Sequence, residues 1–89
     1  MPEITFRIKN KVGLHARPAS VFVREATKYK STITVTCGDK TVNAKSILNV
    51  LTLGANQNAE ITLHAEGEDA DVALKAMSDL NDAFFGDPE

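Results

Sequence analysis

His15 has an unusual position in the segment 13–18, which reads Gly-Leu-His-Ala-Arg-Pro. The residues after it are predicted to form a helix, since Pro18 is tolerated only in a first turn. Histidine is a poor N-cap, and the helix dipole disfavours the imidazolium, so the ring should stay neutral and nucleophilic. First-turn N–H groups and the Arg17 guanidinium would attract an anion. The segment thus predicts an anion or phosphoryl site, although a histidine that merely occupies an N-cap gives the same pattern.

Ser46 can be interpreted in two ways. It directly precedes a short apolar segment, 47–53, that is predicted to be helical, and serine is a favoured N-cap. A phosphate on the same hydroxyl would be tolerated by the helix dipole, so phosphorylation would add charge without breaking the fold. The cap alone is sufficient to explain this residue.

The 47–53 helix is apolar over too wide an arc for a surface helix of two turns. At about 100° per residue, its large apolar side chains span roughly 220°; they are Ile47, Leu48, Val50, Leu51 and Leu53. One core cannot cover that arc, so part of the set formed by Ile47, Leu48 and Leu51 should be exposed. An exposed apolar cluster indicates a protein-binding patch, unless Leu48 and Leu51 pack under a neighbouring loop.

Other catalytic arrangements are missing from the sequence. The second histidine, His64, lies in a polar–apolar alternation beside Glu60 and Thr62 and is interpreted as a surface residue. No second general base near His15, metal-ligand cluster or phosphate-binding glycine loop can be identified. These observations argue against an enzyme with its own turnover, and they indicate no cofactor and no metal.

The elements that must position these residues are four strands and three helices. Apolar residues alternate with polar ones over 4–8, 33–37 and 59–65, and a short strand at 40–43 follows a Gly38-Asp39 turn. Helices are predicted at 16–29, at 47–53 and after an Asp69 N-cap, the last with Val72, Ala73, Met77, Leu80 and Phe84 on its apolar face. The fold class is α+β: an open-faced two-layer sandwich, with an antiparallel sheet covered on one face by helices.

Length and composition set outer limits on function. The 89 residues, 9.6 kDa in all, predict a single domain over 1–89, and one cysteine, Cys37, excludes an internal disulfide. No apolar run could span a membrane, and the start does not resemble a secretion signal, so we expect a cytoplasmic protein. Residues 1–45 carry nine Lys/Arg and three Asp/Glu, but without dense clusters or interleaved aromatics, which argues against nucleic-acid binding.

Two segments together resemble the signatures of HPr, the phosphocarrier family of the bacterial phosphoenolpyruvate-dependent sugar phosphotransferase system. They are 13–18, around His15, and 40–55, around Ser46. The resemblance implies that His15 accepts a phosphoryl group on Nδ1 from Enzyme I and donates it to EIIA domains, with Arg17 stabilising the moving charge. It further implies Ser46 as the target of an HPr kinase/phosphorylase, and a sheet of order 1-4-2-3.

We expect one surface to serve both partners of such a carrier. It would combine the apolar cluster of the 47–53 helix with the exposed side of the first helix; its residues would be Ser20, Arg24, Thr27, Ile47, Leu48 and Leu51. The protein is expected to act as a monomer. Two alternatives stay open: an HPr-like regulatory paralogue of a nitrogen-related or non-transporting branch, and a small enzyme with a histidine nucleophile.

Overall fold

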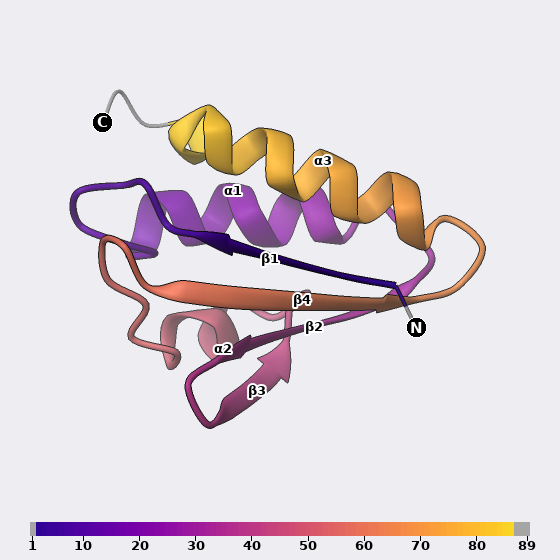
Figure 1. Cartoon of the computed structure of the whole chain (residues 1–89), viewed down its shortest axis with the longest axis horizontal. Coiled ribbons are helices and arrows are strands. Elements are labelled where there is room, and N and C mark those ends of the chain that lie inside the picture. Colours follow the sequence, from indigo (N-terminus) through magenta and orange to yellow (C-terminus); the bar gives the residue numbers. More distant parts are fainter. Residues whose placement is uncertain (1, 87–89) are drawn as a thin grey trace.

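The computed structural model describes residues 2–86, which form a four-stranded sheet with helices on one side (Figure 1). The elements in chain order are β1 (Glu3–Arg7), α1 (Ala16–Ala26), β2 (Thr32–Cys37), β3 (Lys40–Asn43), α2 (Ile47–Leu51), β4 (Glu60–Glu66), α3 (Ala70–Asp82) and the 3₁₀ turn η1 (Phe84–Gly86). Of the domain predicted over 1–89, residues 1 and 87–89 lie outside the described part.

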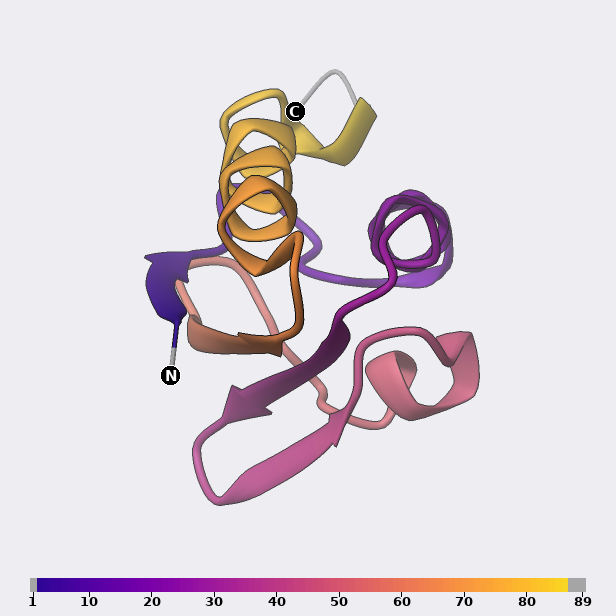
Figure 2. The same cartoon turned by 90° about the vertical axis from the view of Figure 1, so that its right-hand side faces the viewer.

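The sheet is antiparallel throughout and has the order β1-β4-β2-β3, as predicted. All three helices lie on one side of it, and the opposite face is uncovered (Figure 2). This arrangement confirms the predicted open-faced sandwich. The two central strands, β4 and β2, pair with each other over their length, so every strand bonds a central one.

The core lies between the sheet and the helices and uses the alternation seen in the sequence. Alternate residues of β2 and β4 are buried, while their neighbours face the uncovered side. The largest fully buried side chains come from the sheet, from α1 and from the C-terminal segment; they include Ile8, Phe22, Ile33, Ile61, Leu63, Met77 and Phe85. This common core fixes α1, and with it the residue that precedes α1, against the sheet.

Two helices end earlier than predicted. The first was expected to run to Tyr29 but ends at Ala26. The N–H groups of Lys28 and Tyr29 bond only three residues back, to Glu25 O at 3.1 Å and Ala26 O at 3.3 Å. The second was expected to reach Leu53 but ends at Leu51, since Gly54 adopts a left-handed φ of +62°. Tyr29 bonds Glu25 Oε2 at 2.9 Å, and burial and this bond raise the pKa of its hydroxyl.

The apolar face predicted for the last helix was partly wrong. Val72 is 63% exposed, and Leu74 is buried in its place beside Ala73 and Met77. Phe84 lies beyond the helix, in a turn where it has a left-handed φ of +56°. The neighbouring Phe85 enters the core instead and is completely buried.

Asp69 stands at the N-cap position of α3, but its side chain does not cap that helix. Its Oδ2 accepts from Lys30 N at 2.9 Å and its Oδ1 from Ser31 N at 3.0 Å, and Ser31 Oγ donates a short bond to Oδ1. The carboxylate therefore ties the α1–β2 loop to the start of α3. Within residues 2–86, no helix has the length and apolarity needed to cross a bilayer.

Candidate functional site

His15 is the N-cap of α1 and has an extended backbone, with φ −85° and ψ −167°. Its carbonyl accepts from Ala19 N at 2.9 Å and starts the helix, while its side chain makes no capping bond. The residue is exposed. An imidazole that does not serve the helix, at the end where first-turn N–H groups point outward, is placed to meet an anion.

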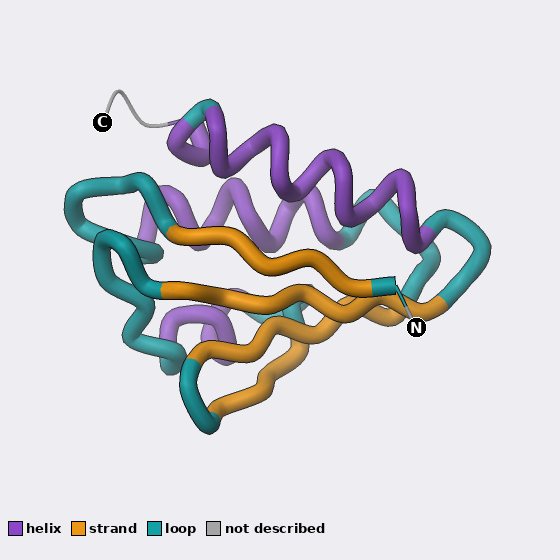
Figure 3. The backbone as a smooth tube through the Cα atoms, viewed as in Figure 1, coloured by secondary structure: helices purple, strands orange, loops and turns teal. Residues whose placement is uncertain are grey.

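Two loops, 8–15 and 52–59, lie side by side at one end of the molecule and hold His15 in place (Figure 3). Leu14 N donates to Ala55 O at 2.8 Å. Gly13 makes this approach possible, since a Cβ there would lie 2.1 Å from Ala55 O, and its φ of +71° also favours glycine. The residue before His15 is therefore fixed by backbone contacts rather than by the histidine itself.

The two loops and α2 enclose a shallow depression of about 290 Å³ beside His15. Its lining residues are Val12, Leu14, His15, Ala16, Leu51, Gly54, Ala55 and Asn56. Apolar side chains and backbone dominate this list. A larger depression, of about 420 Å³, lies at the β2–β3 edge and shares no residue with the first. The depression beside His15 is the relevant one, because it contains the histidine at the helix N-terminus.

Arg17 lies in the first turn of α1, two residues after His15, and is exposed. That turn contains no acidic residue, whereas α3 has Asp71 in the same position. The start of α1 therefore combines the positive end of a helix dipole with a guanidinium. Among residues 2–86, no group of three or more His, Cys, Asp or Glu side chains is arranged to hold a metal ion.

Ser46 is the N-cap of α2, as predicted, with φ −119° and ψ 116°. Its Oγ accepts from Asn49 N at 3.4 Å, a long bond that indicates a weak cap. Ser46 as a whole is half-buried. A phosphate at this position would join a helix N-terminus, as the sequence indicated.

The apolar arc of α2 divides between core and surface. Val50 and Leu53 are buried, while Leu48 is 74% exposed and Ile47 and Leu51 are also exposed. Leu51 lines the depression beside His15, and so does Val12, a 59% exposed residue that the sequence analysis missed. A hydrophobic side chain between Lys11 and Gly13 carries no periodic signal, because it belongs to no regular element.

The first-helix residues predicted for the same surface are spread more widely. Arg24 and Thr27 are exposed and Ser20 is half-buried. Thr27 Oγ1 donates to Arg24 O at 2.8 Å. Thr27 follows His15 by about 18 Å of helix rise, so it lies well away from the depression. α1 and α2 pack against each other, which brings their exposed sides together.

His64 is far less isolated than a plain surface residue. It is half-buried, and its Nε2 lies 2.6 Å from Glu3 Oε2 on the neighbouring strand. Its strand position places it with the outward set of β4, away from the helices. His64 and His15 therefore belong to different faces of the molecule.

Comparisons with known proteins agree on one family. A family model described as the PTS HPr component phosphorylation site matches residues 2–82. The phosphocarrier protein HPr of Mycoplasma capricolum subsp. capricolum is 47% identical over 77 residues, which are 86% of each chain. The crystal structure of HPr-C-His from Thermoanaerobacter tengcongensis is 48% identical, covers 100% of both chains and has a TM-score of 0.95. That of an HPr dimer from the same organism is 49% identical, covers 98% of this chain and 100% of the other, and has a TM-score of 0.78.

The open-faced sandwich and the match to a phosphorylation-site model define a small phosphoryl carrier. More particularly, the chain belongs to the HPr family and is a phosphocarrier of the phosphotransferase system, with a role in sugar transport.

Proposed function

We propose that His15 is the residue that carries the phosphoryl group. Nδ1 of the His15 ring attacks the phosphorus held by phosphorylated Enzyme I, a P–N bond forms, and the bond to the donor breaks. The reverse exchange delivers the group to an EIIA domain. The observation that carries the proposal is the position of His15: an exposed ring at a helix N-terminus, free of a capping role.

Arg17 would stabilise the charge that moves in the transition state. Its guanidinium follows His15 in the first turn, where a cation opposes the helix dipole and so does not serve the helix. A charged donor that bonds the phosphoryl oxygens more strongly in the transition state than in the ground state raises the transfer rate.

We further propose that the protein has no turnover of its own, needs no cofactor and works in the cytoplasm as a monomer. Incubation of the protein without any partner protein tests the first point, since no turnover is expected there. A relative is known as a dimer, so sedimentation of this protein at several concentrations tests the oligomeric state.

Docking of both partners would use the exposed residues of α2 together with the exposed side of α1. Leu51 connects this surface to His15, since it lines the same depression. Ser46 would be the site at which an HPr kinase/phosphorylase regulates docking, because its hydroxyl stands at the start of α2.

Incubation with phosphoenolpyruvate and Enzyme I tests the assignment. Parent protein and His64→Ala should gain an acid-labile phosphoryl group, and His15→Ala should gain none. Arg17→Ala should be labelled about 10–100-fold more slowly, with a change in unfolding free energy below about 1 kcal/mol. Labelling that survives His15→Ala would refute the assignment.

A further inference from the structure

A second set of contacts holds the loop that leads to His15, and it comes from the C-terminal end of the described chain. Asn10 is completely buried in this loop. Its side-chain Nδ2 donates to Phe84 O at 2.7 Å, and its backbone carbonyl accepts from Gly13 N at 3.0 Å. Asn10 thus connects two turns: its side chain bonds the turn after α3, and its backbone closes the tight turn that ends two residues before His15.

The turn that receives this bond is itself held in an unusual conformation. Phe84 and Phe85 have φ of 56° and 48°, a left-handed region that bulky residues rarely adopt. Such backbone persists only where its surroundings fix it. Phe85 is completely buried, and its ring centroid lies 5.7 Å from that of Phe22 in α1.

The C-terminal turn therefore contacts the chain on both sides of His15. It bonds the loop before the histidine through Asn10, and it packs on the helix after the histidine through Phe85. His15 lies between these two segments in the chain, so their relative placement constrains the position of its backbone.

Burial of the Asn10 amide is costly. Within residues 2–86, its Oδ1 has no hydrogen-bond partner. An apolar side chain of the same shape would avoid the desolvation penalty of this buried acceptor. The amide makes one directional bond, from Nδ2 to the Phe84 carbonyl. A directional contact fixes a loop more narrowly than apolar packing does.

We propose that Asn10 is a positioning residue for phosphoryl transfer, and that it acts by fixing the 10–13 turn against the C-terminal turn. The inference rests on the proposed role of His15 as acceptor. Transfer requires the attacking nitrogen within about 3–3.5 Å of the phosphorus and aligned with it, so a small displacement of the ring lowers the rate steeply.

Asn81 offers a matched control. It is 2% exposed, its Nδ2 donates to Arg7 O at 2.8 Å, and its Oδ1 also has no partner among the described residues. It ties α3 to the end of β1, and no hydrogen bond links it to the 10–13 turn. Loss of either amide should affect folding similarly, but only loss of Asn10 should affect His15.

The test compares Asn10→Leu with Asn81→Leu, since leucine keeps the shape and removes both the donor and the unpaired acceptor. In steady-state labelling with Enzyme I, Asn10→Leu should lower kcat about tenfold and leave KM for the carrier within about twofold. Asn81→Leu should leave both constants within about twofold of the parent. If either leucine variant fails to fold, the corresponding alanine pair replaces it.

A second readout needs no partner protein. Amide hydrogen exchange at Gly13 and Leu14 should accelerate in Asn10→Leu and not in Asn81→Leu, because only the former releases the turn. Equal kcat in the two variants, or unchanged exchange in Asn10→Leu, would overturn the proposal. Labelling of His15→Ala would instead overturn the acceptor assignment, and the exchange result would still report on the turn.

Discussion

A single hydrogen atom in place of a side chain allows the loop before His15 to approach the loop after α2. Gly13 has a left-handed φ, and a Cβ on it would collide with the Ala55 carbonyl. Gly38, in the β2–β3 turn, has a similar φ of +63° but nothing within 4 Å of a Cβ. Substitution at Gly38 therefore tests the cost of backbone conformation alone, and substitution at Gly13 tests that cost together with the cost of a collision.

Alanine at the two positions should therefore have different effects. Gly38→Ala should lower the free energy of unfolding by about 1 kcal/mol, from conformation alone. Gly13→Ala should lower it by about 2–4 kcal/mol, because collision with Ala55 adds to the strain. Urea unfolding measures both, and equal losses would show that the two loops do not meet as described.

Asp69 makes stability depend on pH. Its bond from Ser31 Oγ, followed by that from Lys30 N–H, lowers the pKa of its carboxyl below the usual value of 3.8. A lowered folded-state pKa stabilises the protein above the unfolded value, and that contribution is lost as pH falls through the folded one.

Asp69→Asn should accordingly be less stable than the parent near neutral pH, and the gap should narrow below about pH 4. Ser31→Ala removes the hydrogen bond that lowers the Asp69 pKa most. With alanine at position 31, the difference in stability between Asp and Asn at position 69 should therefore be smaller. Thermal unfolding between about pH 2 and 7 provides the measurement. A gap between Asp69→Asn and the parent that stays constant over this range would contradict the assignment.

Strands were easier to predict than helix ends. The period-2 alternation survives in the sheet because one face is buried and the other is open, so Ile61 and Leu63 reveal their strand directly. Helix ends depend on competing bonds that periodicity does not encode. Tyr29 fits the apolar pattern of α1, yet the chain has already tightened before it.

The site was predictable only where a residue type was unusual for its position in the predicted secondary structure. A histidine in an N-cap position was visible in the sequence, and so was an apolar arc too wide for α2. Asn10 and Phe85 were invisible, because their roles arise from contacts between residues more than sixty positions apart. Nothing in the sequence indicated that Phe84 and Phe85 would adopt left-handed backbone.

Helix α2 has only five residues, and its cap bond from Asn49 N to Ser46 Oγ is weak. Replacement of the Ser46 hydroxyl should therefore cost little stability. Ser46→Asp keeps an N-cap acceptor and adds one negative charge at the edge of the exposed cluster of Ile47, Leu48 and Leu51. Negative charge there should repel a partner with an acidic rim.

We expect Ser46→Asp to slow Enzyme I-dependent phosphorylation at low salt while the melting temperature stays nearly unchanged. Added salt should reduce the effect. Ser46→Ala is the control: it loses the cap, worth about 0.5 kcal/mol for so long a bond, but should be phosphorylated at the parent rate. If the two variants react equally fast at low salt, Ser46 serves only as a cap.

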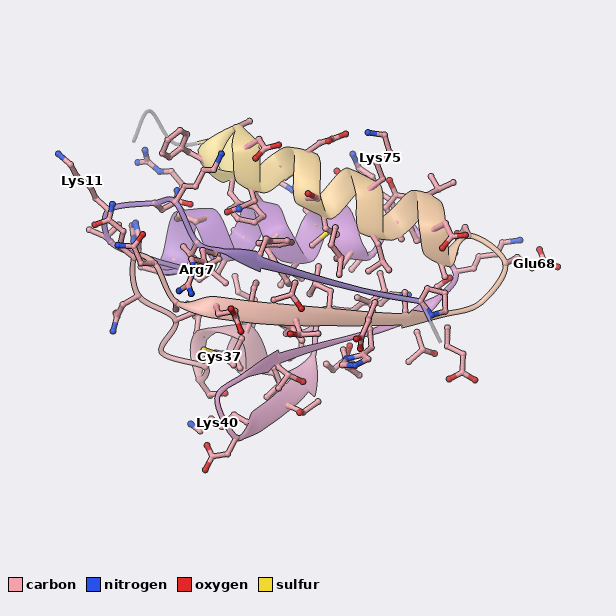
Figure 4. The ribbon with its side chains drawn as sticks, viewed as in Figure 1. Arg7, Lys11, Cys37, Lys40, Glu68 and Lys75 are labelled. Carbon is pink, nitrogen blue, oxygen red and sulfur yellow. The ribbon has the colours of Figure 1, made fainter. Side chains whose placement is uncertain are left out.

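Charge is distributed unevenly over the whole molecule. Residues 1–45 contain nine Lys/Arg and three Asp/Glu (9 − 3 = +6), and residues 46–89 contain one Lys and nine Asp/Glu (1 − 9 = −8). The fold separates part of this charge in space. Lys11 lies at the end of the molecule formed by loops 8–15 and 52–59, and Glu68 lies at the opposite end (Figure 4). Lys75 lies on α3, remote in sequence from that loop and on a different element.

Lys11→Glu and Lys75→Glu make the same change in net charge, from −2 to −4. If positive charge near His15 guides the encounter with an acidic partner, Lys11→Glu should lower kcat/KM for Enzyme I several-fold at low salt, and Lys75→Glu should change it little. The difference should fade as ionic strength rises, since the screening length shortens from about 10 Å at 0.1 M to about 3 Å at 1 M. Both positions are exposed, and exposed ion pairs such as that of Lys75 with Asp79 contribute little, so unfolding free energies should stay within about 1 kcal/mol of the parent. Equal losses in kcat/KM would mean that net charge alone controls the encounter, and that the position of Lys11 in the 8–15 loop has no effect.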